Sequence, residues 1–100
     1  KTALYPAIVL ENKNGLSNLS GTIAMARTDA ATSAQSQFFI NLKNNTSFDY
    51  SASTAGENGY AVFGKVISGS ATLTAIGNVS VDSYYQPKQD VVIYWAKALK

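Results

Sequence analysis

Short apolar runs separated by turn-forming residues most strongly constrain the fold of this 100-residue chain. The runs GTIAMA (21–26), QFFINL (37–42) and YAVFGKVI (60–67) have the length of buried strands, and Gly, Asn, Asp and Ser cluster around them. In the third run, alternation along a strand predicts two faces, which are Tyr60, Val62 and Gly64 on one side and Ala61, Phe63 and Lys65 on the other. A fourth run, VVIYWAKAL (91–99), is rich in β-branched and aromatic residues and is also predicted to be a strand. The pattern predicts an antiparallel β domain.

One segment has a helical pattern. In SGSATLTAIGN, Ser70 is a favourable N-cap, Leu73 and Ile76 share one face, and Gly77 is a stop signal. We therefore predict a short helix over residues 70–76. No linker or internal repeat interrupts the chain, so residues 1–100 are interpreted as part of a single domain.

Composition and charge exclude several classes of protein. Hydrophobic residues make up 46% of the sequence and charged residues 14%, which is typical of a globular chain rather than a disordered one. The net charge is only +2 and the basic residues form no run, so we expect no nucleic-acid partner. No apolar run reaches the roughly 20 residues that a membrane span needs, so we expect no membrane association.

The sequence contains neither cysteine nor histidine. Disulfides, thiol catalysis, a Ser-His-Asp triad and the usual zinc sites are therefore excluded within this chain. The acidic residues are widely spaced and form no loop of alternating carboxylates, so a dedicated calcium site is not indicated. We expect no metal and no cofactor, and the chemistry must use a shaped surface rather than a reactive atom.

Four segments together resemble the C-terminal part of a cyclophilin, a peptidyl-prolyl cis-trans isomerase. They are NGLSNLSGTIAMART, SAQSQFFIN, GYAVFGKVISG with the helix after it, and YYQPKQDVVIYWAKAL. The last segment is most similar to bacterial, especially periplasmic, cyclophilins, which favours the periplasm over the cytoplasm. The resemblance implies a mainly β fold: an antiparallel cyclophilin-like β-barrel with a short helix at one end, here lacking the N-terminal strands.

The implied activity explains why no reactive residue stands out. Rotation about an X–Pro bond meets a barrier of about 18–20 kcal/mol, but no bond has to be cleaved. An isomerase needs an apolar pocket for the proline ring, backbone partners for the flanking peptide, and a donor that stabilises the twisted amide. The expected partners are proline-containing peptides and unfolded proteins.

The resemblance implies a set of substrate-binding residues, which are Ala26, Arg27, Gln37, Phe39, Phe48 and Tyr60. Phe39 would form the wall and floor of the proline pocket, while Phe38 alternates away into the core. Gln37 would hydrogen-bond the substrate backbone.

The remaining residues of the set would line the groove. Ala26 and Arg27 would lie along the extended peptide, with Arg27 offering its main chain. Phe48 stands where many members have Leu, and Tyr60 where eukaryotic members have His and many bacterial members have Tyr. For each aromatic residue the alternative is ordinary core packing.

Two departures from the family limit these expectations. Ser47 stands where cyclosporin-sensitive members have Trp, so we expect weak cyclosporin binding. The family's Phe-His-Arg block, which carries the catalytic arginine, has no counterpart in these residues, so no catalytic residue is assigned. We expect a complementary N-terminal cyclophilin chain to complete the site, and the isolated chain to be weak or inactive. The alternatives are a non-catalytic proline-peptide binding or folding-helper module, and a structural β fragment.

Overall fold

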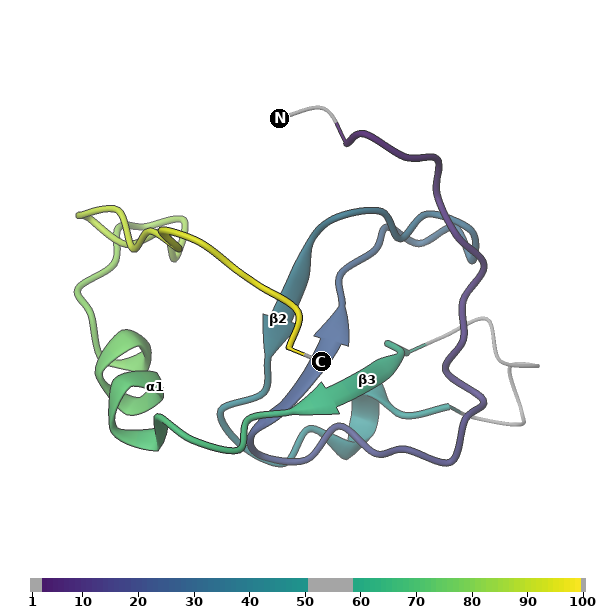
Figure 1. Ribbon diagram of the computed structural model, residues 1–100, viewed down its shortest axis with the longest axis horizontal. Coiled ribbons are helices and arrows are strands. Elements are labelled where there is room, and N and C mark those ends of the chain that lie inside the picture. The colour runs from purple at the N-terminus through teal and green to yellow at the C-terminus, as the bar shows by residue number, and fades with distance from the viewer. Residues whose placement is uncertain (1–2, 51–58, 100) are drawn as a thin grey trace. The chain divides into compact units, whose positions relative to one another are not determined.

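Three of the predicted strands form one antiparallel sheet (Figure 1). The computed structural model describes residues 3–50 and 59–99. The strands are β1 (Thr22–Met25), β2 (Phe38–Ile40) and β3 (Val62–Lys65), in the order β2-β1-β3. A 3-10 helix, η1 (Thr46–Phe48), lies between β2 and β3 in the sequence. The predicted antiparallel β fold is therefore confirmed, as an open sheet in the part of the chain that is described; barrel closure stays a prediction.

The register between β1 and β2 decides which side chains share a face. Ala24 is opposite Phe39, and Met25 is opposite Phe38. Cross-strand partners project from the same face of a sheet, and successive residues project from opposite faces. Phe39 therefore shares a face with Ala24, and Phe38 shares the other face with Met25.

The pairing of β3 with β1 contains an irregularity that the sequence pattern did not predict. Ile23 pairs with Gly64 and Ala24 with Val62, which leaves Phe63 as an extra residue in β3. Such a bulge breaks the strict alternation of faces. As a result Ala61 and Val62 are both buried, while Phe63 is 56% exposed.

The buried residues in the described part of the chain are small or polar. The buried apolar ones are Ala24, Ala34, Ala61 and Val62. The largest fully buried side chains are those of Asn18 and Asn41. These residues belong to the first of two compact units, Lys1–Ser70. Hydrogen bonds between buried polar groups therefore hold this unit together alongside a modest apolar core.

The prediction that Phe38 belongs to the core is wrong for this structure, because 47% of its surface is exposed. The alternation along β2 was predicted correctly, but it fixes only which face Phe38 occupies. Whether a face is buried depends on what packs against it, and the described residues leave this face largely open.

The second compact unit spans Ala71–Lys100. The predicted helix is confirmed as α1 (Ser70–Gly77), which begins at the last residue of the first unit. After it, Asp82 organises a turn: its side-chain carboxylate accepts the backbone N–H groups of Tyr84 at 2.8 Å and Gln86 at 3.1 Å.

The predicted strand at 91–99 is wrong for this structure. These residues have no regular secondary structure, and all nine are exposed. A strand becomes stable only when its backbone groups pair with a neighbouring strand, and no described residue pairs with this segment. The β-branched and aromatic residues of this segment favour a strand, but no described residue supplies the neighbouring strand that it would need.

Candidate functional site

Three aromatic rings of the predicted site pack against one another. The ring centroids of Phe39 and Tyr60 are 5.3 Å apart, those of Phe48 and Tyr60 are 5.0 Å apart, and those of Phe39 and Phe48 are 6.2 Å apart. All three pairs are edge-to-face, the arrangement that aromatic quadrupoles favour. Each of the three residues is partly exposed, so the cluster presents some apolar surface to solvent.

The backbone explains how residues far apart in the sequence meet here. Phe39 lies in β2 opposite the fully buried Ala24, Phe48 ends η1, and Tyr60 lies just before β3. The backbone N–H of Tyr60 donates to the carbonyl oxygen of Phe48 at 2.8 Å, which ties the last two together. Gly59 makes this approach possible, because its φ is +90° and a side chain there would meet the Phe48 carbonyl oxygen.

Arg27 frames this cluster with its side chain. Its Nε donates to the carbonyl oxygen of Gly59 at 2.7 Å, and its Nη1 donates to that of Thr28 at 3.0 Å and that of Ala30 at 3.3 Å. The guanidinium carbon lies 5.6 Å from the centroid of the Tyr60 ring, within cation–π range. The side chain thus braces the loop that carries Tyr60.

Ala26 and Gln37 continue the pairing of β1 with β2. The backbone N–H of Ala26 donates to the carbonyl oxygen of Gln37 at 3.0 Å. These two residues and Arg27 contribute to the lining of one pocket of about 230 Å³, whose other lining residues are mostly polar. The structure therefore places Ala26, Arg27 and Gln37 around one hollow, and Arg27 connects it to the aromatic cluster.

A polar cluster that was not predicted from the sequence is hydrogen-bonded to the backbone of Phe48 and Tyr60. The carboxylate of Asp49 accepts hydrogen bonds from Ser17 Oγ, from the backbone N–H of Asn18 at 2.7 Å and from Asn18 Nδ2 at 3.0 Å. Desolvation by itself would raise the pKa of Asp49, but these three hydrogen bonds outweigh it and hold the pKa below its usual value. No sequence signal marked Asn18 or Asp49, because both types are ordinary in turns.

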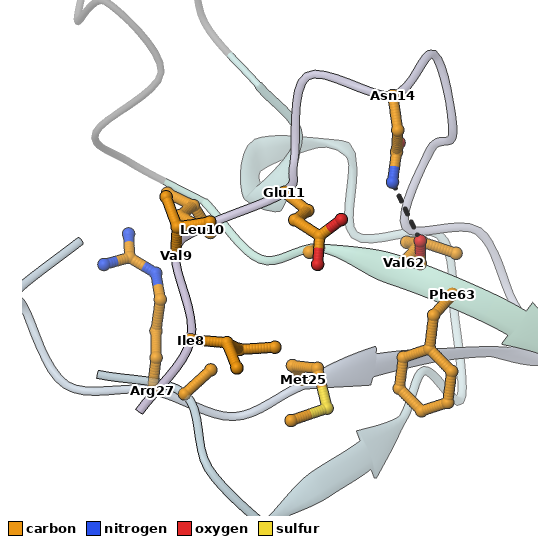
Figure 2. A pocket seen from close by; sticks show the side chains of 11 residues that line it. Ile8, Val9, Leu10, Glu11, Asn14, Met25, Arg27, Val62 and Phe63 are labelled. Carbon is orange, nitrogen blue, oxygen red and sulfur yellow. Dashed lines mark hydrogen bonds between the residues drawn. The ribbon is translucent and has the colours of Figure 1, made fainter. Parts of the chain in front are cut away.

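A second pocket lies between the N-terminal segment and the sheet (Figure 2). Its volume is about 220 Å³, and Ile8, Met25 and Phe63 give it an apolar lining beside the Glu11 carboxylate. Of the six predicted residues, only Arg27 reaches it. None of Phe39, Phe48 and Tyr60 lines this pocket, so it is distinct from the aromatic cluster.

Within residues 3–50 and 59–99, no group of three or more acidic, His or Cys side chains could hold a metal ion. Among the same residues, no helix has the length and hydropathy needed to cross a membrane.

Comparison with known proteins agrees with the resemblance. Residues 2–98 match the model of the family described as cyclophilin type peptidyl-prolyl cis-trans isomerase/CLD. The chain is 43% identical to peptidyl-prolyl cis-trans isomerase A of Dickeya dadantii (strain 3937), over 98% of this chain and 52% of the relative. It is 48% identical to a peptidyl-prolyl cis-trans isomerase of Acinetobacter baylyi (strain ATCC 33305 / BD413 / ADP1), over 83% of this chain and 45% of the relative.

A third relative is peptidyl-prolyl cis-trans isomerase B of Escherichia coli (strain K12), which is 41% identical over 83% of this chain and 53% of the relative. The chain thus spans about half the length of the curated relatives it matches.

Proposed function

Since the chain belongs to the cyclophilin-type peptidyl-prolyl cis-trans isomerase family, we propose that it forms the proline-binding part of an enzyme that accelerates rotation about X–Pro bonds. The substrates are proline-containing peptides and unfolded proteins. The observation that carries the proposal is the accessible cluster of Phe39, Phe48 and Tyr60, whose rings lie within 6.2 Å of one another.

The geometry suits the binding half of this reaction. A proline ring is apolar and compact, and half-buried aromatic faces gain free energy when it displaces water from them. The hollow at Ala26, Arg27 and Gln37 adjoins β1 and β2, where a flanking peptide segment finds polar partners. Holding the ring while the flanking chain turns is what an isomerase requires of its pocket.

The catalytic half of the reaction needs a donor directed at the proline nitrogen as amide conjugation is lost. Arg27 is the single arginine of this chain, and its Nε and Nη1 donate to main-chain carbonyl oxygens. We propose that the donor comes from an N-terminal cyclophilin portion outside these residues, which also covers the apolar face around Phe38. No cofactor takes part.

A titration with proline peptides tests the binding proposal. A short peptide with one Ala–Pro bond should bind and shift the NMR signals of Phe39, Phe48 and Tyr60, whereas the same peptide with Ala–Ala should not. Shifts confined to the pocket of Ile8, Met25 and Phe63 would show that the peptide binds there and not at the aromatic cluster, and would refute the proposed binding site. We also expect weak cyclosporin binding, because Ser47 offers no large ring to the drug.

A second function is favoured by the side chain of Arg27, which donates its hydrogen bonds to main-chain carbonyl oxygens. A chain that binds proline peptides without a catalytic donor would act as a non-catalytic binding or folding-helper module. Binding without any acceleration of isomerisation, even with the N-terminal portion present, would favour that function.

A further inference from the structure

The side-chain amide of Asn18 donates to the backbone of two residues of the aromatic cluster, Phe48 and Tyr60. Its Nδ2 lies 3.2 Å from the carbonyl oxygen of Phe48, 3.2 Å from that of Tyr60 and 3.0 Å from Asp49 Oδ1. An amide nitrogen carries two hydrogens, so three acceptors share them. Asn18 is fully buried, which makes these hydrogen bonds costly to lose because water cannot replace them.

The other end of the same side chain is anchored to the sheet. Asn18 Oδ1 accepts a hydrogen bond from Asn41 Nδ2 at 3.1 Å. Asn41 follows β2 and extends its ladder: its N–H donates to the carbonyl oxygen of Thr22 at 2.9 Å, and its own carbonyl oxygen accepts from Gly21 at 2.7 Å. Asn18 therefore links the end of β2 to the backbone that carries Phe48 and Tyr60.

We propose that Asn18 is a positioning residue that sets the spacing of the aromatic cluster of Phe39, Phe48 and Tyr60. The rings of Phe48 and Tyr60 come from separate segments, and neither segment belongs to β2. One buried amide bonds both segments, and through Asn41 the same side chain is tied to the strand that carries Phe39. The effect on ligand binding rests on the proposed function, whereas the effect on ring geometry does not.

The test compares Asn18→Ala with Thr22→Val. Both variants remove a polar group from one hydrogen-bonded cluster. Thr22 Oγ1 bonds Asn41 Nδ2 and the carbonyl oxygen of Leu19, so Thr22→Val leaves the hydrogen bonds from Asn18 to Phe48 and Tyr60 in place. Ring-to-ring nuclear Overhauser effects should join Phe48 and Tyr60 in the wild type and in Thr22→Val, and should weaken or vanish in Asn18→Ala.

The same comparison is then made for binding of the Ala–Pro peptide under conditions where each variant is folded. Loss of Asn18 should raise Kd about tenfold, because misplaced rings no longer fit the proline ring, and Thr22→Val should change it less than about twofold. A merely structural role would lower the unfolding midpoint of Asn18→Ala but leave Kd and the ring contacts of its folded state unchanged, and that result would overturn the proposal.

Two other outcomes remain decisive. If Asn18→Ala does not fold, Asn18→Ser is measured in its place. Serine keeps a single donor, which cannot bond the carbonyl oxygens of Phe48 and Tyr60 at once, so the ring contacts and the affinity should again weaken. Intact ring contacts and wild-type affinity in Asn18→Ser would refute the positioning role. If the wild type binds no proline peptide, the proposed function fails, while the ring contacts of the variants still decide whether Asn18 positions the cluster.

Discussion

Phe38 and Phe39 are adjacent phenylalanines on opposite faces of β2, so they form a matched pair for testing the pocket. Phe39→Ala should raise the Kd for an Ala–Pro peptide about tenfold or more, because the ring meets both other aromatic residues of the cluster. Phe38→Ala should leave Kd nearly unchanged. Peptide titration on both variants provides the measurement, and equal affinities would refute the assignment of the groove.

The same pair separates affinity from stability. Truncating a fully buried Phe costs about 3–5 kcal/mol, and the 47% exposure of Phe38 places it well below that range. Urea unfolding should show that both variants remain folded, with losses of about 1–3 kcal/mol each. A covering N-terminal portion would raise the cost of Phe38→Ala, since its face would then be buried.

Asp49 makes stability depend on pH. Its pKa is lower in the folded state than the usual 3.8, so its contribution is complete above that value and is lost as pH falls through the folded pKa. Asp49→Asn replaces one accepting carboxylate oxygen with an amide group and, after solvent screening, should cost about 1 kcal/mol near neutral pH. The gap from wild type should close in acid, below about pH 4.

Urea unfolding near neutral pH and again in acid gives the measurement for Asp49. Asp90→Asn, which removes an exposed carboxylate, serves as the control for net charge. A constant difference between wild type and Asp49→Asn across the whole range would show that ionisation of Asp49 does not stabilise the fold.

At the residue scale, the motifs of the sequence predict which residues form the site, and the substrate-binding role of these residues stays a prediction. The resemblance brought Phe39, Phe48 and Tyr60 into one site, and the structure packs their rings together. It missed Asn18 and Asp49, because the importance of a polar side chain depends on partners that lie 30 or more residues away in the sequence.

At the scale of elements, the turn before β3 controls how Phe48 meets Tyr60. A Cβ on Gly59 would lie 3.0 Å from the carbonyl oxygen of Asp49 and closer still to that of Phe48. Gly15 also has a positive φ, of +78°, but a Cβ there would meet nothing within 4 Å. The two glycines therefore separate backbone strain from steric collision.

We predict that Gly15→Ala lowers the free energy of unfolding by about 1 kcal/mol, the usual cost of a positive φ for a residue with a side chain. Gly59→Ala should cost clearly more and should also disturb the ring contacts between Phe48 and Tyr60. Urea unfolding and ring-to-ring nuclear Overhauser effects measure the two consequences. Equal losses in both variants would mean that the close approach at Gly59 has no energetic weight.

The sequence pattern predicts the position of some elements but not of others. Apolar runs bounded by turn residues located β1, β2 and β3, and the capping pattern located α1 to within one residue. The run 91–99 has a similar composition but forms no strand, because strand preference is satisfied only by a partner edge. The bulge at Phe63 was equally hidden, since it arises from the register between two strands.

At the scale of the whole molecule, binding and catalysis should separate. A pocket without a donor at the proline nitrogen binds substrate and transition state about equally, so its binding energy does not become rate. We predict that the 100-residue chain alone gives weak or no acceleration of X–Pro isomerisation in a protease-coupled or exchange-NMR assay. Robust turnover by these residues alone would refute the proposal that the site is shared between this chain and an N-terminal cyclophilin portion.

Adding an N-terminal cyclophilin polypeptide that carries the Phe-His-Arg block should restore activity. Replacing the arginine of that block should abolish the restored rate, whereas Arg27→Ala should have a much smaller effect, because Arg27 braces the loop at Gly59 and Tyr60 through main-chain contacts. The Arg27→Ala variant should lose affinity more than turnover, since it loosens the pocket without removing the donor. If Arg27→Ala instead abolished the rate with affinity intact, the catalytic guanidinium would lie in this chain after all.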